Sequence, residues 1–249
     1  MSIVEQALQF EGLTWLIVAV VLSGLVRGFA GFGTALVFMP IAASVTSPIW
    51  AIIIMMSFDL LGPIALLPRA WRDGETREIT FLGIGALVGL PFGVYFLTKM
   101  DPIIFRWMVS SLSLVMLTFL VSGWRYKNPM NIAMMTFVGL ISGFLAGIAA
   151  LPGPPVILSY ISGSRPASVI RGNTMMYLFL VDIMTFIVFL IKGLLVLLPF
   201  IVGLFLAIPY ALAAIVGQRI FNPKKEYIYR RVAYGLIAAS ALVGLPIWS

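Results

Sequence analysis

Long apolar runs separated by short polar clusters constrain this chain more than any other feature. Most runs are close to the roughly 20 residues that a helix needs to cross the hydrocarbon core of a bilayer. The composition agrees, because 61% of the 249 residues are apolar and only 10% are charged, which is too little charge for a water-soluble surface. The sequence therefore predicts an all-α polytopic membrane protein.

Histidine and cysteine are both missing from the sequence. Their absence excludes disulfides, thiolate nucleophiles, imidazole bases and Cys/His metal sites. We therefore expect no metal, no cofactor and a function other than catalysis. The net charge is +7, but the basic residues lie in loops between apolar runs, a pattern typical of membrane orientation and not of nucleic-acid binding.

Two of the apolar stretches are interrupted by helix-breaking residues. The stretch 13–46 contains Gly28-Phe29-Ala30-Gly31-Phe32-Gly33-Thr34, and the stretch 132–161 contains Gly147 through Pro155 with three prolines. Each stretch is too long for one ordinary helix and short for two full crossings. We predict that each forms a broken, re-entrant helical hairpin. A helix kink or close helix packing is the alternative, since small residues recur four apart near both breaks.

The interrupted stretches belong to an internal repeat. Gly24-Leu-Val-Arg-Gly-Phe aligns with Gly139-Leu-Ile-Ser-Gly-Phe, and Pro91 aligns with Pro209 further along. Two copies of about 120 residues fill the chain, and such repeats decide architecture. The predicted elements are the hairpin 13–46 and spans 48–68, 79–98 and 103–123 in the N-terminal repeat 1–128, and the hairpin 132–161 and spans 166–191, 194–217 and 226–247 in the C-terminal repeat 129–249.

The distribution of Lys and Arg between the loops predicts the orientation. If both hairpins return to the side from which they start, twelve basic residues lie inside and three outside; if each stretch crosses once, the counts are six and nine. The positive-inside rule favours the first arrangement. A repeat with three crossings reverses direction, so we predict inverted repeats with both termini on the periplasmic side.

Inverted repeats with broken helices are typical of secondary transporters. The helix N-termini at the two breaks are expected to meet near the membrane midplane, where their unpaired N–H groups suit an anion. Arg27 adds positive charge beside the first break. The predicted substrate-binding residues flank the two breaks or open the span 166–191: Arg27, Gly28, Gly31, Gly33, Thr34, Gly147, Pro152, Gly153, Asn173 and Thr174.

Two acidic residues, Asp59 and Asp182, lie within apolar runs of comparable spans in the two repeats. A carboxylate in a membrane segment marks an ion pair, a proton relay or a pathway. Either one of them pairs with Arg27, or one carries a coupling proton. The charged run Trp71–Glu78 is interpreted instead as a solvated loop, with Trp71 at the membrane interface.

The glycine pattern Gly24-x-x-x-Gly28-Phe29-x-Gly31-x-Gly33, its second copy from Gly139 and the duplication over the whole chain resemble the sulfite exporter TauE/SafE family. The resemblance implies a multi-pass carrier of the bacterial inner membrane. It also implies a substrate among small organic or sulfur-containing anions such as sulfite or sulfonates, with export as the expected direction. The second break, Ala149–Pro155, contains fewer glycines than the family pattern.

Three functions fit a membrane protein with broken helices. The favoured one is a secondary transporter with alternating access, coupled to protons or sodium; no Walker-type phosphate loop is present to use ATP. An anion channel with re-entrant pore loops is the alternative, and an intramembrane enzyme using Asp59 and Asp182 is the third. The expected partners are a small anionic substrate, the lipid bilayer and the coupling ion. The oligomeric state stays open, a homodimer being one arrangement.

Overall fold

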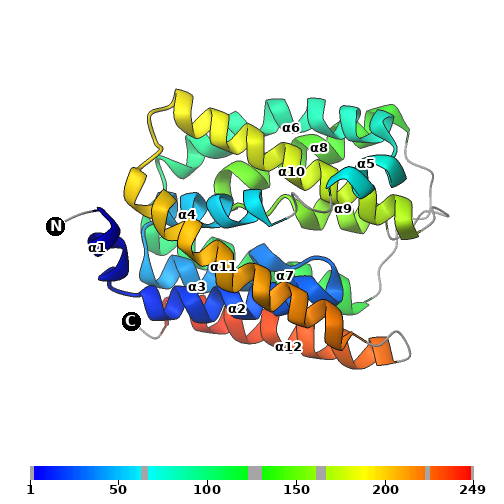
Figure 1. The fold of residues 1–249 in the computed structure, drawn as a ribbon. Helices are drawn as coiled ribbons and strands as arrows, with labels where there is room; N and C mark the ends of the chain where they lie inside the picture. The colour runs from blue at the N-terminus through cyan, green and yellow to red at the C-terminus, as the bar shows by residue number, and fades with distance from the viewer. Residues whose placement is uncertain (1–2, 63–66, 123–130, 161–166, 222–224, 248–249) are drawn as a thin grey trace. The chain divides into compact units, whose positions relative to one another are not determined.

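The computed structural model describes the chain except for residues 1–2, 63–66, 123–130, 161–166, 222–224 and 248–249. Every regular element of the described residues is a helix, which confirms the all-α prediction (Figure 1). The helices are α1 (Ile3–Leu8), α2 (Leu13–Ala30), α3 (Thr34–Val45), α4 (Pro48–Leu61), α5 (Leu67–Asp73), α6 (Thr76–Leu97), α7 (Pro102–Ser122), α8 (Ile132–Ala149), α9 (Gly153–Tyr160), α10 (Ala167–Ile191), α11 (Leu197–Ile220) and α12 (Glu226–Gly244).

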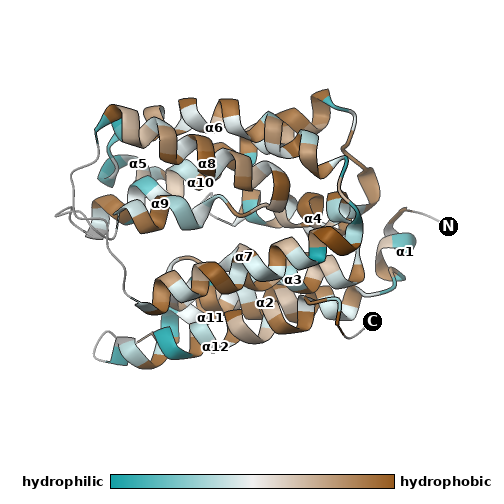
Figure 2. Cartoon of the chain, turned by 180° about the vertical axis from the view of Figure 1, so that it is seen from behind, coloured by the Kyte–Doolittle hydropathy of each residue, from teal (hydrophilic) through white to brown (hydrophobic). Residues whose placement is uncertain are grey.

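Five helices in the described part of the chain are long and apolar enough to cross a membrane: α6, α7, α8, α10 and α11. Figure 2 shows hydrophobic residues along most of the helices, with hydrophilic residues gathered at α5 and at the first turns of α12. The chain therefore has the helices of a multi-pass membrane protein.

Some element boundaries differ from the sequence prediction. Helix α4 ends at Leu61, well short of the predicted span 48–68, because Gly62 and Pro63 follow it in the sequence. Helix α5 occupies part of the cluster that was predicted to be a loop. The predicted boundaries at 161 and 166 lie outside the described residues.

The chain divides into two compact units, and each draws on both halves of the sequence. Unit 1 consists of Met1–Phe58, Met100–Thr118 and Leu195–Ser249, whereas unit 2 consists of Asp59–Lys99 and Phe119–Leu194. These units do not coincide with the predicted repeats 1–128 and 129–249, which stay a prediction together with their inverted relation.

Unit 1 contains the first interrupted stretch as an antiparallel hairpin of α2 and α3. Gly12, which precedes α2, lies beside Val45 at the end of α3, since a Cβ placed on Gly12 would be 3.1 Å from the Val45 Cβ. Gly33, at the start of α3, lies equally close to Val26 of α2. Helices α2 and α3 both pack against α12, and the three run side by side in Figure 1.

Helix α2 also packs closely along α11 in unit 1. A Cβ on Gly24 would lie 2.7 Å from the Tyr210 carbonyl oxygen, and Gly28 faces the backbone of Ala214 and Gly217. The contacts advance together along both helices, so the two helices are parallel. Gly28 is thus a helical residue in a tight helix–helix contact, and the first break starts three residues later than its predicted beginning.

Unit 2 contains a second parallel pair, formed by α6 and α8. A Cβ on Gly143 would lie 2.5 Å from the backbone of Ala86, and one on Gly147 would lie 2.7 Å from the Val94 nitrogen. Helices α5 and α6 pack against α10, and α9 contacts both α8 and α10. As in unit 1, the helix that leads into the break pairs with a helix from the other half of the chain. The glycines on the facing sides of the pair are Gly85, Gly89, Gly93, Gly139, Gly143 and Gly147.

Candidate functional site

The first break is the short connection between α2 and α3. Helix α2 ends at Ala30, and Gly31 adopts a left-handed conformation with φ 78° while its N–H donates to the Arg27 carbonyl oxygen at 2.9 Å. Gly33 has φ 98° and immediately precedes α3. Positive φ angles are accessible to glycine at little cost, so these two glycines explain why the helix stops and restarts here.

The N-terminus of α3 presents backbone N–H donors that suit an anionic ligand. The first N–H groups of any helix lack intrahelical partners and carry the positive end of the helix dipole. Gly33 has no side chain to cap them, and the first intrahelical bond runs from the Val37 N–H to the Gly33 carbonyl oxygen at 3.2 Å. This is the arrangement in which helix N-termini bind anions.

Side chains of unit 1 hold the start of α3 in place. The hydroxyl of Thr34, a predicted substrate ligand, is buried and lies 3.0 Å from the Tyr210 hydroxyl of α11. The Tyr210 ring packs on Phe58 with centroids 4.8 Å apart, and Phe58 packs edge-on against Phe38 at 4.9 Å. Tyr210 therefore fixes the first turn of α3 to α11.

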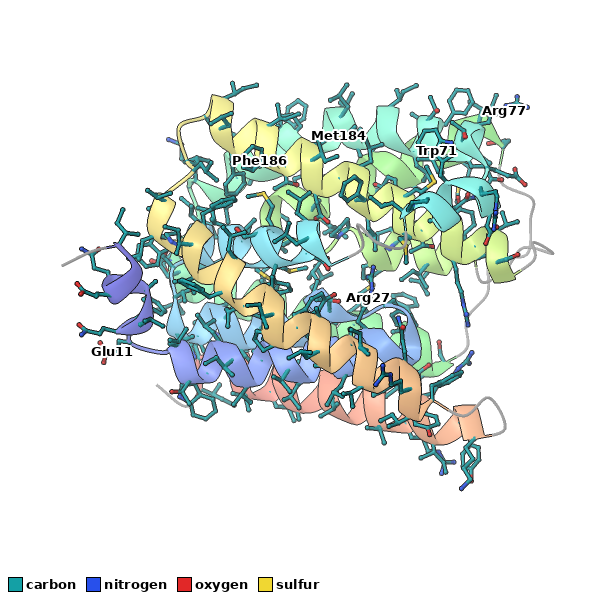
Figure 3. The ribbon with its side chains drawn as sticks, in the orientation of Figure 1. Glu11, Arg27, Trp71, Arg77, Met184 and Phe186 are labelled. Atoms are coloured by element: carbon teal, nitrogen blue, oxygen red, sulfur yellow. The ribbon has the colours of Figure 1, made fainter. Side chains whose placement is uncertain are left out.

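Arg27 is half-buried on α2, one turn before Gly31 (Figure 3). Asp59 is buried near the end of α4, and Asp182 is half-buried in α10. All three residues take part in interactions with other groups of the protein. The ion-pair role and the proton-carrying role of the two carboxylates therefore both stay predictions.

The second break joins α8 to α9 by a different local structure. Helix α8 ends at Ala149, and Ala150 adopts the left-handed conformation with φ 54°. The Leu151 N–H donates to the Leu145 carbonyl oxygen at 3.1 Å, the six-to-one bond of a Schellman motif. The Ser142 hydroxyl of α8 donates to the Pro152 carbonyl oxygen and bridges the break.

The two breaks offer different hydrogen-bond donors. Helix α9 begins Gly153-Pro154-Pro155, so two of its first N–H positions are occupied by proline, which has no N–H. Helix α3 has no proline in its first turn. The second break therefore offers fewer backbone donors than the first, and its part in anion binding stays a prediction. Gly147 lies within α8 against the backbone of α6, so this break begins three residues after its predicted start.

Asn173 of α10 is fully buried, and its side-chain amide is well occupied by protein groups. Its Nδ2 donates to Glu78 Oε2 at 2.7 Å and to the Tyr160 hydroxyl at 3.1 Å. Its Oδ1 accepts from the Glu75 N–H at 2.6 Å. Asn173 thereby joins the start of α6 and the end of α9 to α10. Thr174, the next residue, has a buried hydroxyl that finds no hydrogen-bond partner among the residues that the structure describes.

The interpretation of the charged run Trp71–Glu78 as a solvated loop is wrong in part. Trp71 is exposed, as an interface aromatic should be, but Glu78 is only 3% exposed in the first turn of α6. Sequence reasoning missed Glu78 because its polar partner, Asn173, lies 95 residues away. It also missed Tyr160, Tyr177 and Tyr210. The available signal was a tyrosine inside an apolar run, because a buried hydroxyl requires a partner.

Comparison with known proteins gives one match. The sequence model of the family described as sulfite exporter TauE/SafE matches residues 16–243. No curated protein and no solved structure matches the chain.

Proposed function

Because the chain belongs to the sulfite exporter TauE/SafE family, we propose that it is a secondary transporter of small sulfur-containing or organic anions, with sulfite as the first substrate to test. We further propose export across the bacterial inner membrane as its direction. The observation that carries the choice of an anion is the N-terminus of α3, which has no side-chain cap and begins seven residues after Arg27.

The chemistry of this end of α3 matches a small oxyanion. Sulfite presents several oxygens, and adjacent N–H groups at a helix N-terminus can each donate to one of them. The helix dipole adds a favourable interaction of roughly 0.3–2 kcal/mol. The Arg27 guanidinium contributes a full positive charge, and such charge-assisted hydrogen bonds are about twice as strong as neutral ones.

The proposed transport cycle exposes the bound anion alternately to the two sides of the membrane. Broken helices suit this task because their unpaired backbone groups bind a solute where lipid cannot satisfy them. In this cycle Asp59 or Asp182 carries a proton, and the proton gradient supplies the driving force. A carboxylate that binds a proton in one state of the cycle and releases it in the other links the movement of the proton to that of the anion.

The first experiment measures sulfite movement in proteoliposomes. Vesicles preloaded with sulfite should accumulate labelled sulfite by exchange, with a rate that saturates as sulfite is raised. Arg27→Gln should weaken the apparent affinity, whereas Lys192→Gln, which removes an exposed charge beside Gly193, should not. A flux that neither saturates nor exchanges would indicate the channel alternative and overturn the transporter proposal.

The second experiment tests coupling. Asp59→Asn or Asp182→Asn should still exchange sulfite but should no longer concentrate it when a pH gradient is imposed. Asp101→Asn is the matched control, because Asp101 is exposed and its Oδ1 caps the Ile103 N–H at 2.7 Å, a bond that asparagine preserves. If Asp59→Asn and Asp182→Asn both still accumulate sulfite when the pH gradient is imposed, neither carboxylate carries the proton.

A further inference from the structure

The exposed side of α6 contains a groove near the C-terminal end of the helix. The groove has a volume of about 430 Å³ and is lined by Pro91, Phe92, Tyr95 and Phe96. The three aromatic side chains are exposed. Clefts of roughly 300–1,000 Å³ bind small ligands, so the groove is large enough to hold part of a ligand molecule.

The groove is built by the spacing of its residues and by the packing of α6 on α8 within unit 2. Residues three and four apart lie on one face of a helix, which brings Phe92 next to Tyr95 and Phe96. The Phe96 ring packs edge-on against Phe144 of α8 with centroids 5.9 Å apart, and the Tyr95 ring meets Phe96 edge-on at 5.7 Å. The pair of helices therefore holds the rings that line the groove.

A lysine continues the same face of α6 beyond the groove. The Lys99 N–H donates to the Phe96 carbonyl oxygen at 3.1 Å, so the helical turn extends to Lys99. Lys99 comes three residues after Phe96 and four after Tyr95, which places it on the side of the groove. It is exposed, and its ammonium forms no ion pair with the residues that the structure describes. Asp101, the nearest acidic residue in sequence, caps the Ile103 N–H instead.

The length of α6 from the groove to the lysine matches the depth of one lipid leaflet. Helix α6 is long and apolar enough to cross a membrane, and one leaflet contributes about half of the roughly 30 Å hydrocarbon core. With a rise of about 1.5 Å per residue, Pro91 lies about 12 Å from Lys99 along the helix. Tyrosine and lysine near the end of a membrane helix lie at the level of the lipid headgroups. The groove then lies at the level of the acyl chains.

We propose that this groove binds an acyl chain of an anionic phospholipid, and that the phosphate of the same lipid pairs with the Lys99 ammonium. The exposed rings offer apolar surface to the chain, but apolar contact alone does not select one phospholipid over another. The selection of a net negative headgroup comes from Lys99, since one basic residue near an anionic membrane surface changes affinity about fivefold. The proposal goes beyond anion transport and does not depend on it.

The headgroup is tested by native mass spectrometry of the delipidated full-length protein, which counts bound lipids and yields their dissociation constants. The probes are phosphatidylglycerol and phosphatidylcholine with the same acyl chains. Wild-type protein should bind one phosphatidylglycerol about fivefold more tightly than phosphatidylcholine, and Lys99→Gln should abolish this preference. Lys192→Gln is the matched control, because Lys192 is also an exposed lysine directly after a membrane-crossing helix, α10; it should keep the preference.

The acyl chain is tested by a second pair of variants in the same assay. Phe92→Ala removes a ring from the groove and should weaken the binding of both lipids severalfold. Phe137→Ala is its control, because Phe137 of α8 is 56% exposed, close to the 59% of Phe92, but does not line the groove. Both variants should melt close to the wild type without lipid, since both rings are largely outside the protein core.

Three results would overturn the proposal. Lys99→Gln that still prefers phosphatidylglycerol, or Lys192→Gln that loses the preference equally, would show that Lys99 does not select the headgroup. Equal lipid binding by Phe92→Ala and Phe137→Ala would show that no chain lies in the groove. A wild-type dimer that excludes lipid and that Phe92→Ala dissociates would show that a second copy covers it. None of these measurements involves sulfite, so the proposed function stands or falls separately.

Discussion

Exchanging the residues at the left-handed position of each break should change stability in opposite directions. Gly31 and Ala150 both follow the last residue of a helix and both have positive φ, 78° and 54°. Alanine in this conformation costs roughly 1–2 kcal/mol, while glycine costs about 0.4–1 kcal/mol through the greater entropy of its unfolded chain. The difference is about 0.5–1 kcal/mol in favour of glycine.

Ala150→Gly should therefore stabilise the protein by about 0.5–1 kcal/mol, and Gly31→Ala should destabilise it by a similar amount. The Gly31 change is a clean conformational test, because no atom lies within 4 Å of a Cβ placed there. Ala150 is partly exposed, so losing its methyl group removes little packing. For a chain of this length the expected shifts are about 1–4 °C in melting temperature.

Thermal unfolding in detergent, with tryptophan fluorescence as the signal, measures both shifts under the same conditions. A doubly substituted protein should return close to the wild-type value, since each change acts through the backbone conformation of its own residue. A lower melting temperature for Ala150→Gly, or a higher one for Gly31→Ala, would refute the reasoning from backbone conformation.

Four further substitutions test helix packing and buried hydrogen bonds, each by the change in melting temperature. Gly143→Ala should destabilise by about 1–3 kcal/mol, because the new Cβ would lie 2.5 Å from the Ala86 backbone; Gly235→Ala in α12, where nothing lies within 4 Å, should instead raise stability by roughly 0.5–1 kcal/mol. Asn173→Leu should cost about 2–4 kcal/mol through its three lost hydrogen bonds, and a near-neutral result would show that this amide does not hold α6 in place. Tyr210→Phe should cost about 1 kcal/mol because Thr34 loses its partner, and equal stability would contradict that role.

The helical architecture could be predicted because membrane insertion imposes a simple pattern on the sequence. A helix in lipid must pair its own backbone N–H and C=O groups, and its side chains must be apolar. A membrane span is therefore visible in the sequence as a continuous apolar run. The breaks were also visible, because Gly31, Gly33 and the prolines from Pro152 to Pro155 cannot continue a helix easily. Their boundaries were less visible, since a glycine such as Gly28 serves equally well in a tight helix pair.

The polar interior could not be predicted because its contacts join distant parts of the chain. In the sequence, Glu78 is one of several charged residues in a short polar cluster. Only the structure shows that Asn173 of α10 donates a hydrogen bond to it. Ala150 gives no local signal of a left-handed conformation, since alanine is the strongest helix former. Tyr177 is one aromatic residue among many in an apolar run, and only its burial beside Ser142 distinguishes it.

The exchange of helices between the two halves of the chain has a consequence for biosynthesis. The ribosome will have made every residue of unit 2 once Leu194 is added, while Leu195–Ser249, including α11, is still to come. Helix α2 is made well before α11, so its glycine-lined side lacks its packing partner until α11 has been made. Translation stopped after Leu194 should therefore release a product in which unit 2 is complete and α2 is exposed to chaperones and membrane proteases.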